Sequence, residues 1–257
     1  MSGDAKGFVR LGTDPLAVLS RTRFTVLWSG GKDSTAALLW VLDNVRHEDW
    51  NVLYIEVTGN THPLCTRYVL ETAKALGIRN KLIVARRDDL DFFEALKRYG
   101  IPIIHRNRWC LTLFKLPPIL RYAHYVHVVG VRARESIFRR TNYAHVTYSV
   151  VENRLIVAPI LYWTYKDVTE YLRRWSVDPN PCYALYGHSG NCMFCPNHSK
   201  EKAFKTLLDP EWRSKIVDAL KAQRGKHRVV KMWLALAERI EKTRSLTSYA
   251  TERVRMR

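Results

Sequence analysis

Short apolar runs rich in β-branched residues alternate with longer segments in which apolar residues recur at helical spacing. The short runs predict strands at 24–28, 52–58, 81–85, 126–130 and 155–158. The longer segments predict helices at 34–45, 64–76, 90–99, 113–123 and 166–174. This alternation is typical of an α/β fold, so we expect a doubly wound, mostly parallel sheet with helices on both faces.

The pattern changes at both ends of the chain. Residues 1–22 predict a loose N-terminal extension or a short helix. Residues 199–257 predict a basic helical region, in which Val229, Trp233, Leu236 and Ile240 recur at the spacing of a packed helix face. Helical spacing favours burial of Trp233 over a role in stacking on nucleic-acid bases. Between the ends we expect a nucleotide-binding α/β domain at 23–178 and a cysteine-rich segment at 179–198.

A glycine-rich loop follows the first predicted strand and opens the first predicted helix. It reads Ser29, Gly30, Gly31, Lys32, Asp33 and Ser34. Such a loop points backbone N–H groups and the positive end of a helix dipole at one place, which suits a phosphate. Lys32 adds a positive charge, and the serines add hydroxyl donors. Thr58 and Gly130 also follow predicted strands, so we expect them to line the same crevice as Ser29.

The net charge of the 257-residue chain is +18, from 42 Lys and Arg against 24 Asp and Glu. Half of this excess lies in 199–257, and a chain this basic favours a polyanionic partner such as nucleic acid. No apolar run approaches the roughly 18 residues that a membrane helix needs. We also see no signal-peptide pattern, and therefore expect a cytoplasmic protein without a membrane partner.

The Ser-Gly-Gly-x-Asp-Ser loop resembles the pyrophosphate loop (PP-loop) of the ATP pyrophosphatase superfamily. Four later segments, at 54–63, 130–136, 159–168 and 180–196, are similar in order to the phosphoadenosine phosphosulfate reductase-like branch. The resemblance implies a site for ATP with Mg²⁺. It places the pyrophosphate on residues 29–34, the adenine near residues 56–59, including Thr58 and Gly59, and the phosphates opposite Gly130 and Arg132. Lys32, Asp33 and Arg132 are the implied catalytic residues, with Asp33 a candidate magnesium ligand.

Five cysteines carry the most discriminating chemistry. Cys192 and Cys195 have a spacing common at metal sites, and Cys110 and Cys182 could complete a set of four. The resemblance implies a [4Fe–4S] cluster on these four thiolates. Structural Zn²⁺ is one alternative, and disulfides or free thiols are the other. Trp109 departs from the cysteine pair of the cluster-bearing reductases. We expect Cys65 to be a buried small residue.

The preferred functional hypothesis is an ATP-dependent adenylating sulfurtransferase that acts on a nucleic acid, RNA foremost. The first alternative is a sulfonucleotide reductase-like enzyme. The classical reductases carry a nucleophilic cysteine in a C-terminal segment, and no cysteine follows Cys195 here. The second alternative is an RNA-binding or ribosome-associated module with a regulatory nucleotide site. The sequence leaves the oligomeric state open, with a homodimer as one option.

Overall fold

The computed structural model describes residues 7–12, 14–103, 107–223 and 227–255, with side chains up to residue 243. One seven-stranded sheet has the order β1-β6-β7-β5-β2-β3-β4. Its strands are β1 (Phe8–Gly12), β2 (Phe24–Leu27), β3 (Trp50–Glu56), β4 (Leu82–Arg86), β5 (Val126–Val129), β6 (Val146–Ser149) and β7 (Arg154–Val157). The pairs among β7, β5, β2, β3 and β4 are parallel, and β6 is antiparallel to both β7 and β1. The expected α/β fold with a mostly parallel sheet is confirmed.

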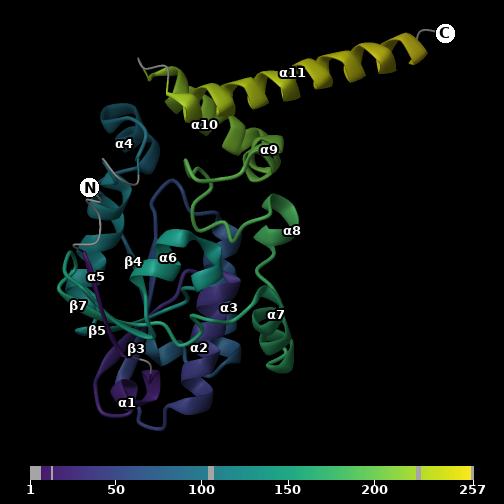
Figure 1. Cartoon of the computed structure of the whole chain (residues 1–257). Coiled ribbons are helices and arrows are strands. Elements are labelled where there is room, and N and C mark those ends of the chain that lie inside the picture. Colours follow the sequence, from purple (N-terminus) through teal and green to yellow (C-terminus); the bar gives the residue numbers. More distant parts are fainter. Residues whose placement is uncertain (1–6, 13, 104–106, 224–226, 256–257) are drawn as a thin grey trace.

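Helices connect and cover the strands (Figure 1). The α-helices are α1 (Pro15–Leu19), α2 (Lys32–Asn44), α3 (Pro63–Ala75), α4 (Phe92–Tyr99), α5 (Leu116–Tyr122), α6 (Ile137–Asn142), α7 (Tyr165–Arg174), α8 (Cys182–Tyr186), α9 (Lys200–Leu208), α10 (Pro210–Lys221) and α11 (Arg228–Arg255). Short turns of other helix types are η1 (Arg79–Lys81), η2 (Leu111–Lys115) and η3 (Ala133–Glu135). Within the described residues, no helix is both long and apolar enough to cross a membrane.

The sheet reverses its winding direction at β2. The chain adds β3 and β4 on one side of β2 and then places β5 on the other side. The loops after β2 and β5 therefore leave the sheet next to each other and open a crevice at its carboxyl edge. This topology puts Ser29 and Gly130 at the same point.

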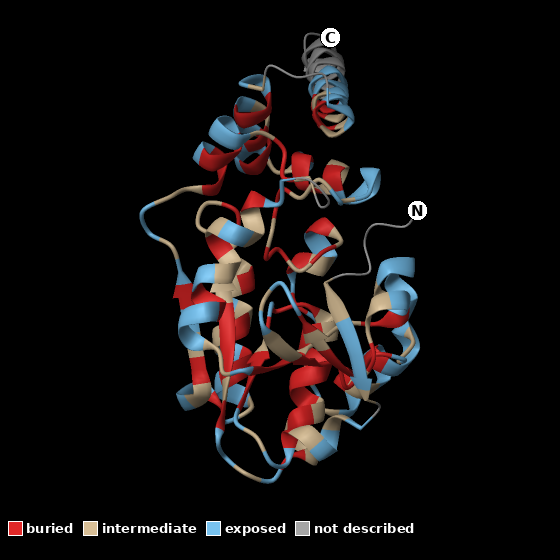
Figure 2. Cartoon of the chain, turned by 60° about the vertical axis from the view of Figure 1, so that its left-hand side comes forward, coloured by how far each residue is buried: buried red, intermediate tan, exposed pale blue. Residues whose placement is uncertain are grey.

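Apolar residues pack on both faces of the sheet, and its central strands are buried (Figure 2). Ile119 of α5 packs with Leu53 of β3 and Ala85 of β4 on one face. On the other face, Phe24 and Val26 of β2 join a larger cluster that includes residues of α2 and α3. The sheet thus has helices on both faces, and its central strands are buried.

The C-terminal helices form their own layer beside the sheet. α9, α10 and α11 pack against one another, and α10 also contacts α4. Trp233 is buried, as the helical spacing predicted, and so is Trp212 of α10. In the part of α11 whose side chains are described, up to residue 243, the buried positions are Val230, Trp233, Ala237 and Ile240, whereas Val229 and Leu236 are only half-buried. In Figure 1, α11 extends well away from the rest of the molecule.

Two local predictions needed correction. The extension before residue 23 contains the short helix α1, but it also contains β1, which pairs with β6 at the sheet edge. The single helix predicted at 113–123 is instead a π-helical turn, η2, followed by α5. Pro117 and Pro118 have no N–H to donate, so they fit the first turn of a new helix better than the interior of a longer one.

Candidate functional site

The loop after β2 is built around two glycines. Gly30 has a φ of +69°, a backbone conformation that glycine adopts without strain. Gly31 is the N-cap of α2 and provides no side-chain hydrogen bond to the first-turn amides of the helix. The Lys32 N–H donates to the Tyr183 hydroxyl, whereas Gly31 provides no cap for the N–H groups that follow. The start of α2 therefore offers N–H donors and a positive dipole end, as an anion site requires.

The two serines of the loop are hydrogen-bonded to each other. The Ser29 and Ser34 hydroxyls are 3.0 Å apart, and the Ser34 hydroxyl also donates to the carbonyl oxygen of Gly31 at 2.9 Å. The Ser29 backbone N–H donates to the Ser34 hydroxyl oxygen at 3.2 Å. These bonds close the loop over the helix start and fix where its donors point.

Gly130 brings the loop after β5 against the start of α2. A Cβ at this position would lie 2.4 Å from the backbone nitrogen of Ser34 and 2.5 Å from the carbonyl carbon of Asp33. Only a residue without a side chain allows this approach. The sequence expectation that Gly130 and the loop at 29–34 meet therefore agrees with the geometry.

Lys32, Asp33 and Arg132 converge at the same point. Arg132 donates from Nε to Oδ1 of Asp33 at 2.6 Å, and Lys32 donates from Nζ to Oδ2 at 2.7 Å. Glu135 accepts from the backbone N–H of Arg132 and lies 3.6 Å from its Nη2. The Arg132 side chain is only 8% exposed, so its charge is held in a fixed place beside the loop. The structure thus brings together all three residues expected to be catalytic.

An apolar cavity of about 150 Å³ opens directly beside Ser29. Its walls are mainly the carboxyl ends of β2 and β3 and the segment before α5: Leu27, Trp28, Ser29, Leu53, Ile55, Leu111, Lys115, Ile119 and Asn191. A flat, apolar ring such as a nucleobase suits a slot of this kind next to a phosphate loop.

Thr58 and Gly59 do not line this cavity. Thr58 donates its hydroxyl to the carbonyl oxygen of Arg87, and Gly59 packs so tightly on Asp91 that a Cβ would lie 1.8 Å from its Oδ2. The residues of β3 that reach the cavity are Leu53 and Ile55, earlier in the strand. In the sequence, Leu53 and Ile55 have the pattern of ordinary core residues of a strand. The sequence therefore gives no signal that they line a cavity.

Three of the predicted metal ligands share a second cavity, of about 80 Å³. Cys110, Cys192 and Cys195 line it together with Lys115. Leu111 and Lys115 line both this cavity and the slot beside Ser29, so the two spaces adjoin. The nearby Cys192 thiol raises the pKa of Lys115 against the opposing effect of burial. Burial raises the pKa of Cys195 to about 11 and also raises that of Cys110.

Cys182 is not part of that cavity. It is fully buried on α8, and its Sγ lies 2.6 Å from where a Cβ of Gly190 would be. Burial raises the pKa of its thiol to about 12. Among the described residues, no group of three or more His, Cys, Asp or Glu side chains is arranged to hold a metal ion. The donor set expected for a [4Fe–4S] cluster or for Zn²⁺ is therefore not assembled, and we derive no step through either group.

Cys65 is buried, as expected, and it backs the PP-loop. Its Sγ lies 3.7 Å from the carbonyl oxygen of Ser29 and 3.5 Å from Nδ2 of Asn180. Burial raises the pKa of this thiol to about 11. These contacts describe a neutral packing residue rather than a reactive thiolate.

Asn180 and Tyr183 support the loop and were not predicted to do so. Asn180 is buried and donates from Nδ2 to the carbonyl oxygens of Gly30 and Ser189, at 3.0 Å and 2.9 Å. The Tyr183 hydroxyl accepts from the backbone N–H of Lys32 at 3.2 Å. Both residues lie in the cysteine-rich segment, in which the sequence analysis predicted Cys182 as a metal ligand. Its neighbours, not its thiol, contact the nucleotide loop.

Several known proteins are similar to this chain. The family model described as the phosphoadenosine phosphosulfate reductase domain matches residues 23–197. Two uncharacterised proteins of Methanocaldococcus jannaschii are 27% and 30% identical over 81% and 76% of the chain. The chain spans only 44% and 46% of their lengths.

One similar solved structure is the phosphoadenylyl-sulfate reductase of Candida auris in its phosphate complex. It is 18% identical, with a TM-score of 0.47, over 67% of this chain and 84% of that one. The family match covers the strands β2 to β7, the PP-loop and the cysteine-rich segment together. This chain belongs to the phosphoadenosine phosphosulfate reductase domain family, a branch of the PP-loop superfamily of nucleotide-binding proteins.

Proposed function

We propose that the chain binds ATP at the loop 29–34 and adenylates a nucleic-acid substrate, RNA foremost, as the activating half of a sulfur transfer. The observation that carries the proposal is the convergence of Lys32, Asp33 and Arg132 on the start of α2, beside an apolar slot of about 150 Å³. In this proposal the loop binds the pyrophosphate of ATP, Arg132 contacts the α-phosphate, and the slot holds the adenine ring.

The charges of the loop are paired before the nucleotide arrives. Asp33 holds both Lys32 and Arg132, at 2.7 Å and 2.6 Å. Incoming phosphates compete with the Asp33 carboxylate for these two cations. Mg²⁺ fits this place because the carboxylate supplies the oxygen ligand that it prefers, and a bound ion would neutralise phosphate charge. Asp33 is the residue that would hold it.

The reaction we propose is displacement at the α-phosphorus. An oxygen of the substrate forms a bond to that phosphorus, the bond to the bridging oxygen of the β-phosphate breaks, and pyrophosphate leaves. Lys32 and Arg132 offset the charge that develops on the phosphate oxygens. The fixed position of Arg132 avoids reorganisation during the step.

Sulfur transfer would follow adenylation. The thiols of Cys110, Cys192 and Cys195 line the cavity next to the slot, which supports sulfur chemistry close to the activated atom. The charge of +18 supports the nucleic-acid substrate. In this proposal the donor of the sulfur is an external one.

Reduction of a sulfated adenylate is the second candidate. The family match itself favours it, since the matching domain carries the reductase name. The same three thiols adjoin the slot, and a thiolate there is the nucleophile that such a reaction needs. The two candidates differ in the product that is released. Adenylation releases pyrophosphate from ATP. In the reductase-like reaction a thiol takes the sulfonate group and the nucleotide leaves, and a second thiol then forms a disulfide and releases sulfite.

One experiment separates the candidates. We would incubate the protein with Mg²⁺ and either ATP plus cellular RNA, or phosphoadenosine phosphosulfate plus a thiol reductant, and measure pyrophosphate and sulfite. RNA-dependent pyrophosphate release that is lost in Lys32→Ala supports the proposal. Sulfite release identifies the reductase-like candidate instead. Binding of RNA and ATP without turnover identifies the third reading, a binding module with a regulatory nucleotide.

A further inference from the structure

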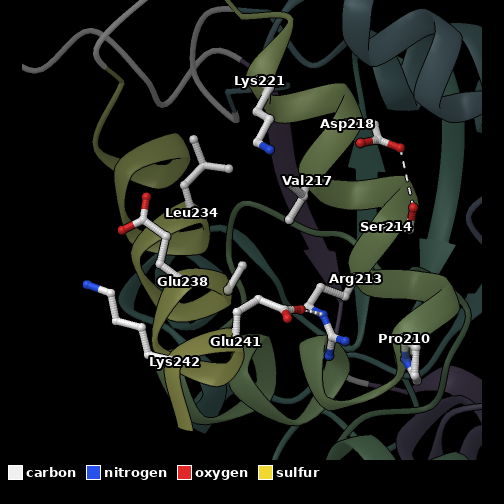
Figure 3. Close-up of a pocket in the computed structure, with 11 residues that line it drawn as sticks. Pro210, Arg213, Ser214, Val217, Asp218, Lys221, Leu234, Glu238, Glu241 and Lys242 are labelled. Atoms are coloured by element: carbon white, nitrogen blue, oxygen red, sulfur yellow. Dashed lines mark hydrogen bonds and ion pairs between the residues drawn. The ribbon is translucent and has the colours of Figure 1, made fainter. Parts of the chain in front are cut away.

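The groove between the C-terminal helices does not suit a polyanion. A cavity of about 570 Å³ lies between α10 and α11 (Figure 3). Its lining carries as many acidic as basic side chains: Arg213, Lys221, Lys242, Asp218, Glu238 and Glu241. Arg213 is paired with Glu241 at 2.7 Å. The groove therefore lacks the excess of positive charge that attracts nucleic acid.

A different surface combines an arginine with exposed aromatic rings. Arg134, on η3, is exposed. Tyr162 lies between β7 and α7 and is 55% exposed, and Tyr165, the first residue of α7, is 63% exposed. Exposed rings of this size are costly in water and are informative when they gather beside cations. We call Arg134, Tyr162 and Tyr165 the aromatic–arginine face.

Specific contacts hold the two segments of this face together. The backbone N–H of Ala133 donates to the carbonyl oxygen of Leu161 at 2.7 Å, so η3 and the residues before α7 run side by side. Hydrogen bonds from Thr164, and then the charge of Arg134, lower the pKa of the Asp167 carboxyl. Arg134 therefore lies near the start of α7, where Tyr165 is located.

The face begins at the nucleotide loop itself. Nζ of Lys32 lies 5.6 Å from the centre of the Tyr165 ring. Lys32 in turn binds Asp33, the partner of Arg132. The adenine slot opens elsewhere, between Ser29 and the ends of β2 and β3. A group lying on Tyr165 would therefore be close to the phosphates without occupying the slot.

We infer that the aromatic–arginine face binds single-stranded nucleic acid, with bases stacked on Tyr162 and Tyr165 and a phosphate on Arg134. The inference rests on the proposed function, for which it names the surface that presents the substrate. Stacking requires the flat side of a base, which a duplex hides between base pairs. Exposed rings beside an arginine therefore favour a single strand.

Fluorescence anisotropy without ATP tests this directly. The probes are fluorescein-labelled single strands of RNA and of DNA, about 12 nucleotides long, and the corresponding duplexes. The test variants are Tyr162→Ala, Tyr165→Ala and Arg134→Ala. The matched controls are Tyr125→Ala and Arg79→Ala, exposed residues before the amino ends of β5 and β4, at the opposite edge of the sheet.

We expect each tyrosine variant to weaken single-strand binding about tenfold and to leave duplex binding unchanged. Arg134→Ala should weaken binding of both the single strand and the duplex. It should also reduce the slope of log K against log salt concentration by about one, as the loss of one phosphate contact implies. Losses no larger than those of Tyr125→Ala and Arg79→Ala would overturn the inference. So would a duplex that binds as tightly as the single strand. Comparison of the RNA and DNA probes identifies which strand is preferred.

Two measurements separate this inference from the proposed function. ATP affinity of Tyr162→Ala should match that of the wild type, because the Tyr162 ring lies outside the nucleotide slot. Lys32→Ala should lose ATP binding but keep most of its affinity for the single strand. If strand binding follows the expected pattern and no pyrophosphate is released, the inference that this face binds a single strand is supported and the adenylation proposal fails.

Discussion

The side-chain amide of Asn180 donates a hydrogen bond to the carbonyl oxygen of Gly30 at 3.0 Å, across 150 residues of sequence. The same amide reaches Ser189, and its Oδ1 accepts from the backbone N–H of Cys182. One buried residue therefore ties the nucleotide loop to the cysteine-rich segment.

Replacement of Asn180 by Ala should loosen the loop. The change leaves the Gly30 carbonyl and the Cys182 amide unpaired in a buried place, which costs about 1–3 kcal/mol for each such group. We expect a lower free energy of unfolding in urea and a roughly tenfold weaker affinity for ATP, as a 1.4 kcal/mol loss implies. Asn44→Ala is the control, because the Asn44 amide bonds only within its own helix, to Trp40. Equal effects of the two changes would show that Asn180 has no special role.

Gly130→Ala should disturb the approach of the β5 loop to α2. The added methyl group would lie 2.4 Å from a backbone nitrogen, so main chain has to move. We expect a loss of about 1–3 kcal/mol in the free energy of unfolding and a marked loss of ATP affinity by calorimetry. Gly12→Ala is the matched control, since its nearest neighbour would be 3.8 Å away. A Gly130→Ala protein as stable as Gly12→Ala would contradict the close approach.

Arg132→Lys should reduce adenylation although it keeps the positive charge. Lysine cannot reproduce the planar arrangement that bonds Asp33 and faces Glu135 together. We expect the rate of RNA-dependent pyrophosphate release to fall about 100-fold, with a smaller change in ATP affinity. Arg121→Lys, an exposed change on α5, serves as the control. A loss in ATP affinity alone, at an unchanged rate of release, would assign Arg132 to ground-state binding.

His127 should make the protein sensitive to acid. It is fully buried in β5, its Nδ1 lies 3.9 Å from Oε2 of Glu152, and burial lowers its pKa to about 4. In the unfolded chain the pKa is about 6.5, so the unfolded state binds the proton first as the pH falls. The stability contributed by the neutral ring is complete above pH 6.5 and is lost progressively towards pH 4.

Urea unfolding between pH 4 and 7 measures this effect. We expect a contribution of about 1.4 kcal/mol per pH unit from His127 near pH 5. His127→Leu should flatten the dependence by that amount, even if the variant is less stable at neutral pH. Burial also lowers the pKa of His188 to about 4 and that of His198 to about 3, so some dependence should remain. Parallel pH curves for wild type and variant would rule out His127 as a source.

Local sequence patterns were enough to define the nucleotide loop. Residues 24–27 form the expected strand, Gly30 adopts the positive φ, and α2 begins at Lys32. These features depend on neighbouring residues: a β-branched run, two glycines and a helix-forming segment. The alternation of strands and helices also specified the parallel sheet, because its central apolar runs, β2 and β5, are buried on both faces.

The sequence missed features that depend on contacts between distant segments. β1 is short and half-exposed, and it is ordered by pairing with β6 rather than by its own pattern. Thr58 and Gly59 follow the predicted strand, but they pack on Arg87 and Asp91, and Leu53 and Ile55 line the slot instead.

The cysteines illustrate best the difference between what local sequence specifies and what contacts between distant segments decide. Their spacing indicated a set of four, yet spacing along the chain does not fix the direction in which each side chain points. Packing on Gly190 turns Cys182 away, while Cys110, Cys192 and Cys195 meet at a cavity that adjoins the slot. The sequence by itself determined the loop, the fold class and the charge. Only the tertiary structure decided which side chains meet, because that depends on packing between segments that are far apart in the chain.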